Sequence, residues 1–218
     1  RIMESEFSPV VRGLAVAAVL AAVMSTTDAL LLDAEATSAK LEAWIRDQLR
    51  HRLQIAHRHL GPPWPDAGDE HLTAELETWL EPQLEGCRSL EDLRGLDLSE
   101  ALWQGLDWSL RPQLERLLPE RLPVPTGRLV RVDYSTGEPV LAVKLQELFG
   151  LAQPPALCRG RLPLTVHLLA PNGRPAQITR DLASFWQNGY PQVKKELKGR
   201  YPKHDWPDDP LSAAPTAR

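Results

Sequence analysis

The sequence predicts an α+β fold: a helical bundle, then a small antiparallel β module closed by short C-terminal helices. Apolar residues recur at helical spacing as far as about residue 121. After the Pro- and Gly-containing segment 122–127 the apolar period becomes two, and helical spacing returns after Asp181. With 218 residues, 43% of them hydrophobic and 25% charged, the composition is that of an ordinary globular protein.

The helical part is predicted to comprise a helical segment of unassigned role at 1–45 and a helical domain at 46–121. The apolar run Leu14–Met24 is too short to span a membrane, which takes about 20 residues. We interpret it as a core helix, and the apolar centre of a signal sequence is the alternative. The remaining predicted helices cover 37–60, 71–85, 89–93, 99–106 and 110–121.

Capping and helix-breaking residues set the limits of these helices. Gly61 and the prolines that follow it end the helix over 37–60. Asp69 is the expected N-cap of the helix over 71–85, and Pro82 should kink that helix. Gly105 separates the last two helices.

The β module is predicted over 122–206. Val130, Val132 and Tyr134 alternate with polar residues and share one face of a strand. The next segment leaves two alternatives open, a strand over 139–145 or a short helix over 144–149. Two further strands, 162–169 and 175–179, flank the hairpin signal Pro171-Asn172-Gly173.

Two short helices should close the module. Asp181 is the expected N-cap of the first, and Pro191 lies at the start of the second. The tail 207–218 is rich in Pro, Ala and Asp and is predicted to be disordered.

The two cysteines, Cys87 and Cys158, favour free buried thiols in a reducing compartment, hence a cytoplasmic protein. A single disulfide between them is the alternative.

Charge is divided unevenly along the chain. Residues 66–100 carry eleven acids and two arginines, a local charge of −9. Residues 121–206 carry thirteen Lys or Arg and six acids, a local charge of +7. Such asymmetry indicates contact with a polyanion, or else two lobes of one molecule that attract each other.

Motifs for chemistry are lacking in the sequence. Neither of the Gly-rich phosphate-binding patterns occurs, and Asp69-Glu70-His71 follows a Pro-rich connector where an ATPase motif would follow a buried strand. His57 and His59 point to different faces of one helix, so no metal site is expected. No serine lies in a nucleophile elbow and neither cysteine in a reactive context. We therefore predict no catalytic residue and no cofactor in this chain.

The basic C-terminal segment is the one positive signal for function. Its lysines and arginines can neutralise phosphates, and its aromatic rings can stack on unpaired bases. Arginines at the strands resemble the cations on OB-like barrels that bind single strands. The structural alternative is that the aromatics anchor the core and the cations form a solvated helix face. The candidate nucleic-acid-binding residues are Arg128, Arg131, Arg180, Tyr190, Lys194, Lys195, Lys198, Arg200, Tyr201, Lys203 and Trp206.

Several of these stretches resemble a known family. The segments 122–127, 131–134, 141–151 and 162–179, with the run 181–210, are similar to the C-terminal region of bacterial HrpB-type ATP-dependent helicases of the DExH-box class. The resemblance extends over about 50–212, is most specific in the last 90 residues, and is poor in 1–45.

The resemblance implies an accessory region of a bacterial ATP-dependent RNA helicase that contacts single-stranded RNA or braces the motor. ATP and Mg²⁺ are expected only in the RecA-like motor domains of the parent helicase, so the chain should be inactive alone. A purely structural docking module without nucleic-acid contact is the alternative. The implied partners are single-stranded RNA and the motor domains, with no membrane.

Overall fold

A computed structural model describes residues 48–84 and 96–217. The chain divides into two compact units, Arg1–Gln113 and Leu114–Arg218, whereas the sequence analysis placed the boundary after residue 121. The division falls within helix α8 (Leu110–Leu117), because the second half of that helix belongs to the sheet-containing unit. The predictions for 1–45, for the helix over 89–93 and for Cys87 concern residues outside the described ranges.

Helix α3 (Gln48–Leu60) opens the described part of the first unit. It confirms the described part of the helix predicted over 37–60. Its buried side includes Leu53, Ile55 and Ala56, each at most 1% exposed. The helix ends where the Gly61 amide donates to the carbonyl of His57 at 2.9 Å, with Gly61 at a φ of 69° that suits glycine.

The helix predicted over 71–85 is divided in the structure. It consists of α4 (Asp69–Ala74), α5 (Leu76–Trp79) and the 3₁₀ turn η1 (Glu81–Leu84). The N-cap is Gly68 and not Asp69 as predicted. Asp66 instead accepts a hydrogen bond from the Gly68 amide at 2.9 Å, so the carboxylate that stabilises the start of the helix lies two residues before its cap.

The remaining helices of the first unit are α7 (Leu98–Gln104) and the start of α8. The Asp97 carboxylate caps α7 by accepting from the Ser99 and Glu100 amides at 2.9 and 3.1 Å. Gly105 lies at the C-cap of α7, as expected from its helix-breaking character.

The second unit contains a five-stranded sheet in the order β1-β2-β3-β4-β5. β1–β2, β2–β3 and β4–β5 are antiparallel, but β3 and β4 are parallel. The predicted α+β class is thus confirmed. The prediction of an antiparallel sheet is wrong for one strand pair, β3 and β4. The OB-like architecture remains a prediction. The strands are β1 (Arg121–Pro123), β2 (Leu129–Asp133), β3 (Val140–Lys144), β4 (Thr165–Leu169) and β5 (Pro175–Thr179).

The parallel pair requires a long connection between β3 and β4. This connection contains the 3₁₀ turns η2 (Leu145–Leu148) and η3 (Cys158–Gly160). The sequence left open a strand over 139–145 or a short helix over 144–149. The structure contains one after the other, the strand β3 to Lys144 and then the 3₁₀ turn η2.

Burial alternates along the strands and defines the core face. Val132, Tyr134 and Val143 are fully buried, and Val166 and Leu168 lie on the same side of β4. The Tyr134 hydroxyl donates to the Pro119 carbonyl at 2.8 Å, which satisfies the one polar atom of that side chain. The predicted alternation in β2 is confirmed.

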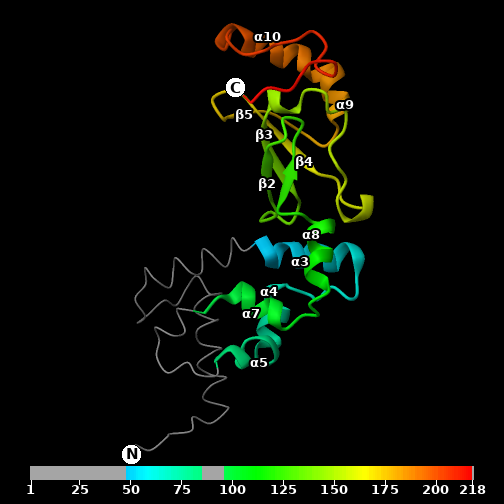
Figure 1. The fold of residues 1–218 in the computed structure, drawn as a ribbon, viewed down its shortest axis with the longest axis vertical. Coiled ribbons are helices and arrows are strands. Elements are labelled where there is room, and N and C mark those ends of the chain that lie inside the picture. Colours follow the sequence, from blue (N-terminus) through cyan, green and yellow to red (C-terminus); the bar gives the residue numbers. More distant parts are fainter. Residues whose placement is uncertain (1–47, 85–95, 218) are drawn as a thin grey trace, which may run out of the picture. The chain divides into compact units, whose positions relative to one another are not determined.

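Residues 182–200 form consecutive helical segments beyond one end of the strands (Figure 1). They are α9 (Leu182–Ser184), the π-helical turn η4 (Phe185–Gly189) and α10 (Tyr190–Arg200). The Asp181 carboxylate accepts from the Ser184 amide at 2.9 Å, which confirms the predicted N-cap.

A cluster of aromatic rings joins these helices to the rest of the unit. The Trp186 ring contacts those of Phe185 and Tyr190, with centroids 5.0 and 5.6 Å away, and Phe149 lies 6.1 Å from Trp186. The tilted and edge-to-face angles are the ones that aromatic pairs favour. The indole N–H of Trp186 donates to the Leu151 carbonyl at 2.8 Å, so the cluster is also tied to the loop after η2.

The tail from Pro207 is ordered in the structure, so the predicted disorder is wrong for its described residues. The Pro207 carbonyl accepts from the Tyr190 hydroxyl at 3.0 Å. The Gly150 amide donates to the Pro210 carbonyl at 3.0 Å, and the Thr216 amide to the Gln146 carbonyl at 3.0 Å. The Pro, Ala and Asp content of the tail predicted disorder, but its backbone carbonyls accept hydrogen bonds from Tyr190 and Gly150.

Among the described residues, no helix has both the length and the apolar character that crossing a membrane requires.

Candidate nucleic-acid interface

Two of the three candidate aromatics are part of the core. Tyr190 is 1% exposed and Trp206 is 8% exposed. The Trp206 indole N–H donates to the Tyr201 carbonyl at 2.9 Å, and burial raises the pKa of the Tyr190 hydroxyl. Neither ring face is available to a nucleobase, so we remove both residues from the candidate interface. The structural alternative, aromatics as core anchors, holds for this pair.

Tyr201 is half-buried and makes an edge-to-face contact with His204, whose ring centroid lies 6.1 Å away. It is the one candidate aromatic that retains accessible surface.

Three of the candidate cations have acidic partners. Arg128 donates through Nε and Nη2 to the two carboxylate oxygens of Glu147 at 2.7 and 2.9 Å. Lys194 donates to the Pro207 carbonyl at 2.9 Å and to Asp208 at 2.5 Å. This hydrogen bond, followed by the charge of Lys194, lowers the pKa of Asp208. Both cations serve the fold, and a phosphate would have to displace a carboxylate to reach them.

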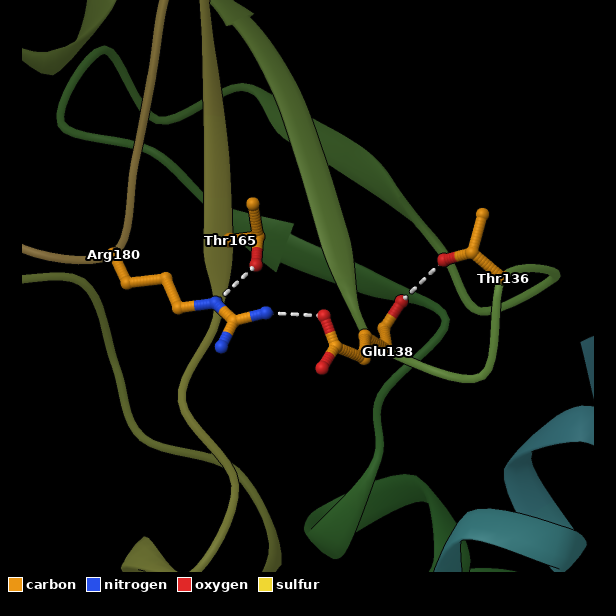
Figure 2. A network of polar contacts seen from close by, with 4 residues as sticks. All are labelled: Thr136, Glu138, Thr165 and Arg180. Carbon is orange, nitrogen blue, oxygen red and sulfur yellow. Dashed lines mark hydrogen bonds and ion pairs between the residues drawn. The ribbon is translucent and has the colours of Figure 1, made fainter.

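Arg180 belongs to a polar network on the surface of the sheet, shown in Figure 2. Its Nε donates to the Thr165 hydroxyl at 3.0 Å, and its Nη2 forms an ion pair with Glu138. The Thr136 hydroxyl donates to the Glu138 carbonyl at 3.1 Å. Arg180 therefore links the end of β5 to the turn before β3.

The other candidate cations are exposed. No ion pair is formed by any of them with an acid in the described ranges 48–84 and 96–217. Lys195 and Lys198 are three residues apart on α10 and share a face. Lys198 also lies near enough to Asp208 to contribute to lowering the pKa of that carboxyl. The exposed set is Arg131, Lys195, Lys198, Arg200 and Lys203.

One further cation was missed by the sequence analysis. Arg121 lies on β1 directly opposite Arg131 on β2, and both side chains are exposed. The helix predicted over 110–121 ends at Leu117 in the structure, and Arg121 belongs to the three-residue strand β1. Because Arg121 was assigned to the end of that helix, the strand that carries it was not recognised. The alternation of exposed and buried residues at 121–124 is the signal that could have found it.

Two kinds of group in the described residues bear on catalysis, metal-ligating side chains and free thiols. No cluster of three or more His, Cys, Asp or Glu there could hold a metal ion. Cys158 is a free, buried thiol, and burial raises its pKa to about 11. It is protonated at neutral pH and therefore a poor nucleophile. The described surface carries exposed cations on β1, β2 and α10.

Comparison with known proteins shows the family to which this chain belongs. Residues 79–210 match the family HrpB_C, described as ATP-dependent helicase C-terminal. The chain belongs to this family. It is 49% identical over 174 residues to the ATP-dependent RNA helicase HrpB of Escherichia coli strain K12, covering 79% of this chain and 22% of that protein. The chain thus spans about a fifth of the length of this relative.

Two solved structures agree with the family. One, the crystal structure of the E. coli DExH-box NTPase HrpB, superposes with a TM-score of 0.74 at 48% identity and covers 80% of this chain and 22% of that one. The other, the crystal structure of the Escherichia coli DEAH/RHA helicase HrpB, gives a TM-score of 0.64 at 39% identity over 94% of this chain and 25% of that one. The resemblance to HrpB-type helicases noted in the sequence is confirmed.

Proposed function

We propose that this HrpB-family C-terminal region is an accessory part of an ATP-dependent helicase and binds the backbone phosphates of single-stranded RNA. The observation that carries the proposal is the exposed group Lys195, Lys198, Arg200 and Lys203, which has no ion-pair partner among the described residues. Exposed cations of this kind release counterions from a nucleic-acid backbone on binding, whatever the sequence of bases.

The burial of two candidate aromatic residues argues against base stacking as the main contact with RNA. With Tyr190 and Trp206 inside the core, stacking contributes little, and each stacked base would otherwise add about 1–3 kcal/mol. We therefore infer backbone contact with weak base preference. ATP hydrolysis, with its Mg²⁺, we assign to parts of HrpB-type helicases that this chain does not span. The cytoplasmic location also remains a prediction.

The test is fluorescence anisotropy of a labelled oligouridine strand with the full chain. The triple variant Lys195→Glu, Lys198→Glu and Lys203→Glu should weaken binding about tenfold or more, because several phosphate contacts become repulsive. Lys194 is left unchanged because it holds the tail through Pro207 and Asp208. The control is Arg174→Glu, which reverses an exposed cation on the β4–β5 turn. Equal affinity of the triple variant and the control would count against the proposal.

Docking against the rest of an HrpB-type helicase is a second candidate, favoured by Trp108. This side chain is 86% exposed. The Asp107 carboxylate accepts from the Ser109 amide at 2.8 Å, which fixes the turn that presents the ring. Exposed tryptophans are frequent anchors of protein interfaces. Trp108→Ala should then weaken binding to the part of E. coli HrpB outside the aligned region while leaving RNA affinity unchanged, and unaltered binding to that part would exclude this role.

A further inference from the structure

Arg121 on β1 and Arg131 on β2 lie directly opposite each other, at a position of the antiparallel ladder where the side chains of the two strands come closest. Their register is direct, Arg121 opposite Arg131. The Val132 amide donates to the Glu120 carbonyl at 2.9 Å, and the Val124 amide to the Arg128 carbonyl at 3.0 Å. Hydrogen-bonded pairs alternate with non-bonded pairs in an antiparallel ladder. The arginine pair therefore occupies a non-bonded position, where Cα atoms are about 4.5 Å apart and side chains lie closest.

This arrangement is unfavourable without an anion. Like charges directly opposite each other on adjacent strands destabilise a sheet. Neither arginine forms an ion pair with an acid in the described ranges 48–84 and 96–217. Asp133, two residues further along β2, accepts from the Ser135 amide at 2.9 Å at the turn that follows. Two guanidinium groups held side by side match the oxygens of one phosphate.

Two exposed apolar side chains, Leu129 and Ile178, lie on the same side of the sheet as this pair. Leu129, two residues before Arg131 on the same side of β2, is 56% exposed. The register Ala142–His167–Ile178 extends the solvent side of the sheet to β5, where Ile178 is 53% exposed. An exposed leucine next to two fixed cations suits a ligand that alternates charged and less polar groups, as a single strand alternates phosphates with sugars and bases.

We propose that Arg121 and Arg131 jointly bind one backbone phosphate of a single-stranded nucleic acid, with Leu129 against the adjoining sugar or base. The site rests on the proposed function and extends it from α10 to the edge of the sheet. The repulsion within this pair carries a cost in the unbound protein, which a bound phosphate offsets.

Two measurements on the double variant Arg121→Gln and Arg131→Gln test the site. First, its thermal unfolding temperature in chloride buffer should be higher than that of the wild type, because the repulsion is removed. Added sulfate at constant ionic strength should then stabilise the wild type more than the variant. Second, the slope of log affinity for oligouridine against log salt should become shallower by about 0.7, the change expected for one lost phosphate contact. The matched control, Arg174→Gln, should alter neither quantity. If the double variant is unfolded, each single variant is used in the same way.

The outcomes separate this site from the proposed function. If the double variant binds RNA with wild-type affinity and slope while the lysine triple variant loses binding, the arginine site is wrong and the proposed function stands. If the wild type binds no strand, both fail. If oligoglutamate binds as tightly as RNA through the same two arginines, the surface recognises acidic protein and the assignment to nucleic acid is overturned.

Discussion

The Arg128 guanidinium binds both carboxylate oxygens of Glu147, at 2.7 and 2.9 Å, although only the arginine reaches solvent. The Glu147 side chain is 3% exposed and that of Arg128 is 52% exposed. The pair joins the turn after β1 to η2. The buried negative charge of Glu147 is therefore neutralised by a residue at the surface. Arg128 was a candidate for binding phosphate, and its geometry assigns it to the fold.

Removing that arginine should destabilise the sheet unit. Breaking a buried ion pair leaves an uncompensated charge and costs about 3–5 kcal/mol. Because Arg128 is half exposed, we expect a lower value for Arg128→Met, about 2–3 kcal/mol of unfolding free energy, measured by urea denaturation. Arg174→Met removes an exposed cation without an acidic partner and should change stability by less than about 0.5 kcal/mol. Equal losses in both variants would contradict the structural role.

Gly189, at the N-cap of α10, and Gly199, in the last turn of that helix, offer a matched pair of glycines. A Cβ at Gly189 would lie 2.8 Å from Cδ2 of Phe185, a ring packed in the aromatic cluster, whereas at Gly199 nothing lies within 4 Å. Gly189→Ala should therefore cost about 1–3 kcal/mol by overpacking. Gly199→Ala should stabilise α10 by about 0.5–1 kcal/mol through helix propensity. Thermal unfolding of the two variants checks both signs, and stabilisation by Gly189→Ala would show that the ring is free to move.

The ion pair between Lys194 and Asp208 should be visible in the titration of the carboxyl. A hydrogen bond from Lys194, and then its charge, lower the Asp208 pKa below 3.8, with Lys198 the smallest contributor. Lys194→Met should raise this pKa toward 3.8, and Lys198→Met should raise it less. Because the folded pKa is depressed, the contribution to stability is present above 3.8 and is lost as the pH falls through the folded value. NMR titration of the carboxyl measures this, and identical shifts in both variants would contradict the assigned pairing.

The tail should be required for stability. Deletion of 207–218 leaves the Tyr190 hydroxyl, the Gly150 amide and Lys194 without their acceptors. Of these groups only Tyr190 is buried. One buried polar group left unsatisfied costs about 1–3 kcal/mol, and we expect a loss of that size. Hydrogen exchange provides a second measurement, because the Gly150 and Thr216 amides should be protected in the full chain. Fast exchange at both amides would restore the disordered tail that the sequence predicted.

Sequence patterns predicted the features that depend on residues close together in the chain, such as strand alternation and helix caps. They did not predict strand pairing, which depends on residues far apart in the chain. The alternation in β2 and the Asp181 cap were predictable because burial period and capping act within a few residues. The parallel pairing of β3 with β4 was not, since strands carry no local mark of which partner they take across a connection.

The candidate site shows the same limit. An aromatic such as Tyr190 has the same sequence signature whether it stacks on a base or on Trp186, and only packing distinguishes the two. Glu147 is 19 residues from the arginine that it binds, so charge counting assigned Arg128 to the surface. The exposed lysines of α10 were predicted correctly as cations on a helix, and Arg121 was missed because its strand is only three residues long.

Salt dependence tests the central claim most directly. The full chain should bind labelled oligouridine, and its log affinity should fall linearly with log salt with a slope of about −0.7 per phosphate contacted. Contacts by the exposed lysines of α10 and one phosphate at Arg121 and Arg131 predict a slope steeper than about −2. Affinity that does not change with salt, or no measurable binding at low salt, would contradict the account.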